Sequence, residues 1–200
     1  MAKFNHILIP LDFSPASILA LKCGMEIAKI HQSRVHVLHV FRLIDDQETI
    51  ENSRALALRN SLTNDLKEKM EVLKTTYSDP LAIDASFELQ IGFPEDVIEP
   101  YIFKHDIDTV ILGTSGAGLS AECYGSTFSA IVKNNKTAII ALPKNADYET
   151  VKPELLEKIM EPNHSSQATD SSLILTISHS DFELRTKENS DQIYIIETKK

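Results

Sequence analysis

The feature that most constrains the fold is a repeated alternation of short apolar runs with longer segments of helical spacing. Strands that alternate with helices form βαβ units, whose right-handed crossovers cover both faces of a parallel sheet. We therefore predict an α/β fold with a doubly wound, five-stranded parallel sheet in the order 3-2-1-4-5 and helices on both faces. The five runs that we expect to be its strands are His6–Leu11, Val35–Phe41, Ile83–Ile91, Thr109–Leu112 and Thr137–Leu142.

The segments between these runs repeat apolar residues every three or four positions, which is typical of amphipathic helices. One helix is expected from Pro15, since Asp12-Phe13-Ser14 reads as a turn and cap and proline suits the first helical position. The other expected helices are Ser53–Tyr77, a segment that starts at Gly92–Asp96, and Ser126–Asn134.

After Pro143 the pattern changes. Residues 1–144 form the predicted main domain, and residues 145–200 form a C-terminal extension. The extension is expected to hold a short helix, a polar linker and a small β-meander of three strands. These strands could join the main sheet, pair across a dimer or form a separate flap. The segments are 149–160 for the helix, 161–170 for the linker, and 173–177, 182–186 and 193–197 for the strands.

Composition narrows the function. The chain has 29 Asp and Glu against 20 Lys and Arg, a net charge of −9, which argues against binding a nucleic acid or an anionic membrane. No apolar run is long enough to span a bilayer, and the first residues lack the pattern of a secretory signal. The two cysteines, Cys23 and Cys123, make neither a zinc spacing nor a disulfide framework. We expect a cytoplasmic protein.

Two loops with glycines or short polar residues follow the first and fourth strands. The predicted strand order reverses between these two strands. Open α/β sheets bind ligands in the crevice at such a switch point. The first loop is Pro10–Ser14, and the second runs from Gly113-Thr114-Ser115-Gly116 to Gly125-Ser126-Thr127. Glycines let main-chain N–H groups approach a ligand, and a helix start carries unpaired N–H groups. Together they can hold a phosphate without a lysine.

These residues resemble the universal stress protein domain over residues 1 to about 144. The resemblance is carried by Ile7–Ser14, Val37–Val40, Gly92, Ile107–Thr114 and Gly125-Ser126. ATP-binding members of that family have Gly-x-x-Gly, nine residues, and then Gly-Ser or Gly-Thr. This chain departs from the pattern, because only eight residues, Ala117 to Tyr124, separate the second and third glycines.

The resemblance implies a nucleotide site for ATP or a related adenine nucleotide, with Mg²⁺ as a possible companion. The phosphate cradle would consist of Gly113, Gly116, Gly125, Ser126 and Thr127. Asp12 would face the ribose or the phosphate-bound cation, and the adenine pocket would be lined by Pro10, Leu11 and Val40.

Simpler roles compete with each of these assignments. Asp12 is equally suited to cap the helix that follows, and Ser14, Ser126 and Thr127 suit helix caps better than nucleophiles, because no base is placed to activate them. No metal site is predicted, since His36 and His39 lie three apart on a strand and point to opposite faces. Cys123 could alternatively be a redox-sensing thiol.

Three classes of function remain. The first is a regulatory protein of the stress response that binds an adenine nucleotide and acts as a dimer. The second is a stress-associated dimer that binds no nucleotide and acts through protein contacts. The third is an enzyme, for which no signature beyond slow ATP hydrolysis is present. The dimer is expected from the family and from the apolar edge strand 137–142, since an exposed apolar edge invites pairing.

Overall fold

A computed structural model describes residues 4–42, 53–77, 83–113, 137–142, 147–160, 174–178 and 193–197. Its strands form one sheet in the order β3-β2-β1-β4-β5-β7-β6. The predicted doubly wound order 3-2-1-4-5 is confirmed, because each neighbouring pair among these five strands is parallel. The elements are β1 (His6–Pro10), α1 (Pro15–His31), β2 (Arg34–Phe41), α2 (Ser53–Tyr77), β3 (Asp84–Ile91), α3 (Pro94–Lys104), β4 (Thr109–Gly113), β5 (Ala138–Leu142), α5 (Tyr148–Met160), β6 (Ile174–Ser178) and β7 (Ile193–Glu197).

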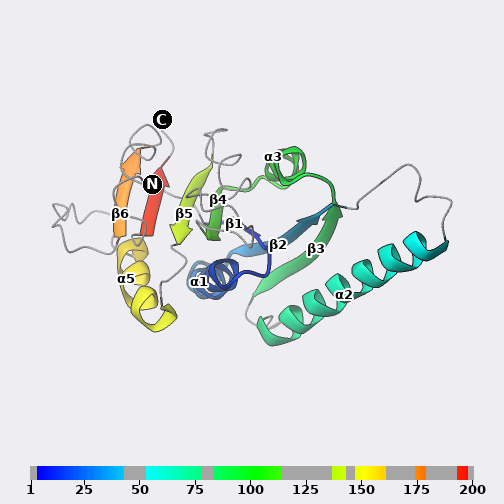
Figure 1. Ribbon diagram of the computed structural model, residues 1–200. Helices are drawn as coiled ribbons and strands as arrows, with labels where there is room; N and C mark the ends of the chain where they lie inside the picture. The colour runs from blue at the N-terminus through cyan, green and yellow to red at the C-terminus, as the bar shows by residue number, and fades with distance from the viewer. Residues whose placement is uncertain are drawn as a thin grey trace.

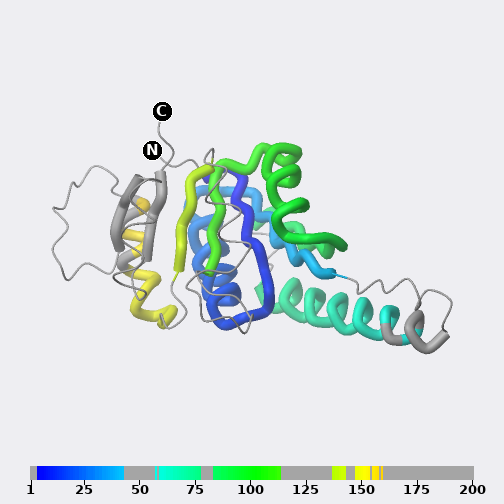
Figure 2. Tube along the Cα trace, turned by 45° about the horizontal axis from the view of Figure 1, so that its top comes forward, coloured from blue at the N-terminus to red at the C-terminus, as the bar shows by residue number. Residues whose placement is uncertain are grey.

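Helices lie on both faces of the sheet, with α1, α2 and α5 on one face and α3 on the other (Figures 1 and 2). Each face has its own hydrophobic cluster. The cluster under α1, α2 and α5 includes Ile9, Leu21 and Leu155, and the cluster under α3 includes Leu8 and Ile98. The central strands are therefore buried on both sides, which explains why their sequences read as continuous apolar runs.

The C-terminal extension joins the main sheet. β7 pairs antiparallel with β5, with Ile140 opposite Ile195, and β6 pairs in parallel with β7. The predicted meander is wrong for these two strands, because β6 pairs directly with β7, whereas a meander would have the expected strand 182–186 between them. The third expected strand, 182–186, lies outside the described residues, as does the expected helix 126–134.

The prediction that residues 137–142 offer a free edge to a second copy is also corrected, since β7 of the same chain occupies that edge. The sequence could not show this pairing, because nothing in a five-residue apolar strand specifies which strand it pairs with. The predicted helix of the extension is present as α5, and its Val151, Leu155 and Ile159 are buried in the cluster shared with α1. The domain boundary after residue 144 stays a prediction.

Candidate functional site

The candidate site lies at the carboxyl ends of β1 and β4, where the strand order reverses. These strands are adjacent, with Ile7 opposite Thr109 and Leu8 opposite Val110. The chain leaves β1 through α1 on one face and reaches β4 through α3 on the other (Figure 1). This divergence is the geometry in which open α/β sheets form a ligand crevice.

The turn after β1 is built by short polar side chains. Asp12 Oδ1 accepts a hydrogen bond from the backbone N–H of Ser14 at 3.0 Å. Ser14 is the N-cap of α1, and its Oγ accepts from the N–H of Ser17 at 3.2 Å. Pro15 follows in the first turn. The predicted capping role therefore belongs to Ser14, while Asp12 closes the turn that precedes the helix.

Gly113 brings the end of β4 against the start of α1. A Cβ atom at this position would lie 2.5 Å from the Cβ of Ala16 and 2.9 Å from its carbonyl carbon. No side chain fits there, because backbone atoms cannot move aside as a flexible side-chain tip can. The first turn of α1 and the last residue of β4 therefore touch, so the two loops predicted to form the site begin side by side.

Phe13 has a backbone conformation that the sequence did not signal. Its φ is +61°, which a bulky side chain rarely adopts and which recurs at binding sites that hold strain. Its ring packs edge-on against the His39 ring, with 4.7 Å between centroids. The Lys69 ammonium of α2 lies 5.8 Å from the centre of the Phe13 ring.

His39 lies near the carboxyl end of β2, where it contacts the turn that follows β1. Its Nδ1 lies 2.7 Å from the carbonyl oxygen of Leu11, which fixes that nitrogen as the donor. Burial lowers the pKa of His39, and the Lys69 charge lowers it further, while the bond to Leu11 and the Asp12 charge oppose this shift. The ring is thus held as neutral imidazole near pH 7.

The structure separates two residues predicted to share an adenine pocket. Leu11 is only 3% exposed and packs in the cluster under α1, whereas Val40 packs in the cluster under α3. Their side chains thus lie in different layers of the fold. The main chain of Leu11 is also engaged, because its N–H donates to Leu38 and its carbonyl meets His39.

Among the predicted site residues, Pro10 is buried at the end of β1, and Gly113 ends β4 beside α1. Gly116, Gly125, Ser126 and Thr127 lie outside the described residues, as does Cys123. Sequence reasoning missed Phe13 and Lys69. A basic residue on the exposed face of a long helix has no signal that would set it apart from its neighbours.

Two simple chemistries find no support in the described part of the chain. No group of three or more His, Cys, Asp or Glu among those residues is arranged to hold a metal ion. The other cysteine, Cys23, is 2% exposed, and burial raises the pKa of its thiol to about 12, as expected for a core residue. No described helix is long and apolar enough to cross a membrane.

Comparison with known proteins gives one consistent result. The model of the Universal stress protein family matches residues 3–143. Universal stress protein MJ0577 of Methanocaldococcus jannaschii is 28% identical over 163 residues, which cover 72% of this chain and 98% of that protein. Universal stress protein MJ0531 of the same organism is 26% identical over 145 residues, covering 70% and 83%.

Solved structures agree on the fold. The structure of MJ0577 superposes with a TM-score of 0.60 at 23% identity, covering 72% of this chain and 99% of that one. Universal stress protein UspA from Lactobacillus plantarum superposes with a TM-score of 0.55 at 24% identity, covering 70% and 99%. The family match ends at residue 143, before α5, β6 and β7.

Proposed function

The chain belongs to the universal stress protein family, and we propose that it is a regulatory protein of the stress response that binds ATP or a related adenine nucleotide between β1 and β4. The observation that carries the proposal is the contact of Gly113 with the first turn of α1. This contact puts Gly113 against Ala16 in the first turn of α1, the helix that follows the Asp12 turn. Main-chain N–H groups at such a place suit phosphate oxygens.

Asp12 and Lys69 would then supply the charged side chains of the site, each for a different part of the nucleotide. Asp12 would accept a hydrogen bond from a ribose hydroxyl or hold Mg²⁺ through water. The phosphates would be bound by Gly113, Gly116, Gly125, Ser126 and Thr127. The family pattern supplies this part of the proposal, and the Asp12 turn is compatible with it. Lys69 lies on α2 near Phe13 and His39. It could compensate phosphate charge for which the glycine loop holds no basic residue.

The test separates the carboxylate charge of Asp12 from its structural role. Asp12→Asn keeps an oxygen for the Ser14 N–H, so the turn is expected to survive. If Asp12 meets the nucleotide, the affinity for ATP with Mg²⁺, measured by calorimetry, should fall about tenfold or more, the usual worth of a charged hydrogen bond. Asp108→Asn, at the other end of the sheet, is the matched control and should change the affinity less than twofold.

Nucleotide carried through purification gives an independent reading. Heat denaturation of the isolated protein should release an adenine nucleotide into the supernatant. Absence of released nucleotide, together with no heat of binding at millimolar ATP, would reject the proposal. Unchanged affinity in the Asp12→Asn variant would remove Asp12 from the site while leaving the crevice in place.

A second candidate function is a stress-associated protein that acts through protein contacts and binds no nucleotide. The observation that favours it is the loop of eight residues, Ala117 to Tyr124, in place of nine. Neither proposal includes pairing of two copies through β5, because β7 occupies that edge. Light scattering on the full chain should therefore give the mass of a monomer. A dimer would mean that a different surface pairs, or that β7 is exchanged between copies.

A further inference from the structure

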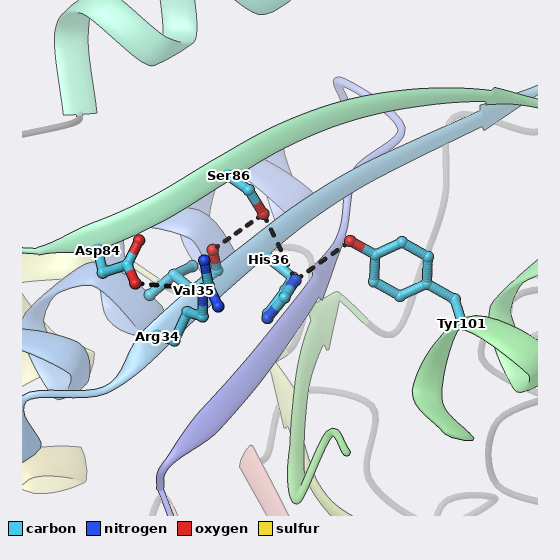
Figure 3. Close-up of polar contacts among 6 residues, drawn as sticks. All are labelled: Arg34, Val35, His36, Asp84, Ser86 and Tyr101. Atoms are coloured by element: carbon cyan, nitrogen blue, oxygen red, sulfur yellow. Dashed lines mark hydrogen bonds and ion pairs between the residues drawn. The ribbon is translucent and has the colours of Figure 1, made fainter. Parts of the chain in front are cut away.

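A cluster of titratable side chains and one serine hydroxyl lies towards the amino ends of the strands, away from the crevice and on the face covered by α3. We call it the His36 cluster, and its members are His6, His36, Ser86, Glu88, Tyr101 and His105. They come from β1, β2, β3, α3 and the residue after α3. Figure 3 shows His36 on β2, with Ser86 of β3 on one side and Tyr101 of α3 on the other.

The hydrogen bonds of this cluster determine where the proton of His36 sits. The Tyr101 hydroxyl donates to Glu88 Oε1 at 2.8 Å. It has only one proton, so at its 3.1 Å contact with His36 Nδ1 it must accept. Nδ1 therefore carries the proton, and Nε2 is the nitrogen left to take up a second one in acid.

His36 Nε2 has no partner for that second proton. Only three buried side-chain polar atoms of the described residues lack a hydrogen bond, and they are His36 Nε2, His6 Nδ1 and Asp108 Oδ1. All three lie in or beside this cluster, because the Asp108 N–H donates to the His6 carbonyl. His36 itself is 4% exposed. A proton on Nε2 would create a buried cation with no acceptor.

Most of the titratable and charged groups that face His36 also oppose its protonation. The rings of His6 and His105 lie 6.0 and 5.1 Å from the His36 ring, and Arg34 lies two residues earlier on the same strand. Arg34 is itself paired with Asp84 at 3.1 Å. Burial lowers the pKa of His36 to about 4, with His105, Arg34 and His6 adding to the effect and Glu88 opposing it.

We propose that the His36 cluster is an acid-sensitive latch, closed at neutral pH, which releases the C-terminal half of α3 from the sheet when a second proton enters His36. Closed, the latch joins α3 to β2 and β3 through Tyr101. Tyr101 also stacks on His105, with 4.1 Å between ring centres, so both residues at this end of α3 depend on the contact. Protonated, His36 gains water as a partner only when α3 moves away.

The direction of the pH effect follows from the two protonation states. With α3 released, His36 titrates near its ordinary value of about 6.5, and in the closed state it titrates near 4. The open form therefore binds more protons between these values. The latch is fully stable above pH 6.5 and weakens as the pH falls towards 4. Between pH 7 and pH 5 the opening equilibrium should rise about 20-fold.

Hydrogen–deuterium exchange tests the latch on the full chain. Protection factors, which remove the intrinsic pH dependence of exchange, should fall about 20-fold at residues 98–104 between pH 7 and pH 5. Residues 19–28 of α1 serve as the internal reference and should change little. His36→Asn keeps a donor for Tyr101 without titrating, so it should abolish most of the fall. His31→Asn, on the exposed end of α1, is the matched control and should behave like wild type.

A titration of the imidazole nitrogens by NMR decides the proposal even where the His36→Asn variant does not fold. It should show the proton on Nδ1 of His36 at pH 7 and a pKa far below the ordinary histidine value of about 6.5. A His36 that titrates near pH 6.5 in the folded chain would overturn the proposal. So would equal changes in protection of α3 and α1 between pH 7 and pH 5.

Discussion

The carboxyl and amino ends of the parallel strands are held together by different kinds of contact. At the carboxyl ends of β1 and β4, the geometry comes from main chain and small residues, with Asp12 and Ser14 bonding to backbone N–H groups and Gly113 touching Ala16. At the amino ends, it comes from long side chains that reach across strands, such as Tyr101 to Glu88. The difference shows that close main-chain contacts shape one end, whereas side-chain hydrogen bonds fix α3 on the sheet at the other.

The two ends of the sheet also differ in how protonation of their histidines is expected to affect them. His39 near the crevice donates to the Leu11 carbonyl and has the Asp12 charge close by, which supports a proton on the ring. His36 at the opposite end faces two further imidazoles and an arginine. Burial lowers the pKa values of both histidines, but acid is expected to weaken the amino end more than the carboxyl end, because His105, Arg34 and His6 lower the pKa of His36 further, whereas the Leu11 bond and the Asp12 charge raise that of His39.

The largest effect is expected from adding one methyl group at the carboxyl end. Gly113→Ala should lower the free energy of unfolding by about 2–3 kcal/mol, because its Cβ meets the Ala16 backbone. Gly24→Ala is the matched control, since its Cβ also meets an atom at 2.5 Å, but that atom is the movable tip of Ile9. With the gain in helix propensity of about 1 kcal/mol, it should stay within about 1 kcal/mol of wild type. Urea unfolding of both variants measures the contrast, and equal losses would contradict it.

A smaller effect is expected from removing one oxygen at the amino end. Tyr101→Phe keeps the ring but removes the 3.1 Å acceptor of the His36 Nδ1–H and the donor to Glu88, so Nδ1 keeps only its longer contact of 3.4 Å with Ser86 Oγ. The free energy of unfolding at pH 7 should fall by about 1–2 kcal/mol. ATP affinity should not change, because the crevice lies at the other end of the sheet. A parallel loss of affinity would show that the two ends are coupled.

The smallest effect is expected from the charge of Lys69. Lys69→Met keeps an unbranched chain over the Phe13 ring but removes the cation. ATP should bind about two- to fivefold more weakly at low salt, and the difference should shrink as salt is added, since exposed charges are screened. Lys67→Met on the same helix is the control. Equal effects of the two substitutions would mean that only net charge matters.

Much of the fold could be predicted from the sequence because its signals are local. Apolar runs bounded by turn residues predicted β1 to β5, and Ser14-Pro15 predicted the start of α1. The pairing of β7 with β5 could not be predicted, because it joins segments about fifty residues apart and nothing in either marks its partner.

The candidate site, like the fold, was predictable from the sequence only in part. The turn at Asp12 followed from its local residues, and the meeting of β1 with β4 followed from strand order. The positive φ of Phe13 and the place of Lys69 depend on tertiary packing. The His36 cluster was least predictable, since its members are spread over one hundred residues. Gly113 was assigned to a phosphate cradle, and the structure adds a packing reason for glycine there.

The most direct test of the site is a map of backbone amide shifts by NMR during addition of ATP with Mg²⁺ to the full chain. If nucleotide binds where the strand order reverses, the amides of residues 11–14, 39–41 and 113 should shift together and saturate. The amides of residues 5, 34–36, 84–86 and 105–108 at the opposite end should stay in place. Shifts confined to the amino end, or no shifts at millimolar ATP, would contradict the assignment of the crevice as the nucleotide site.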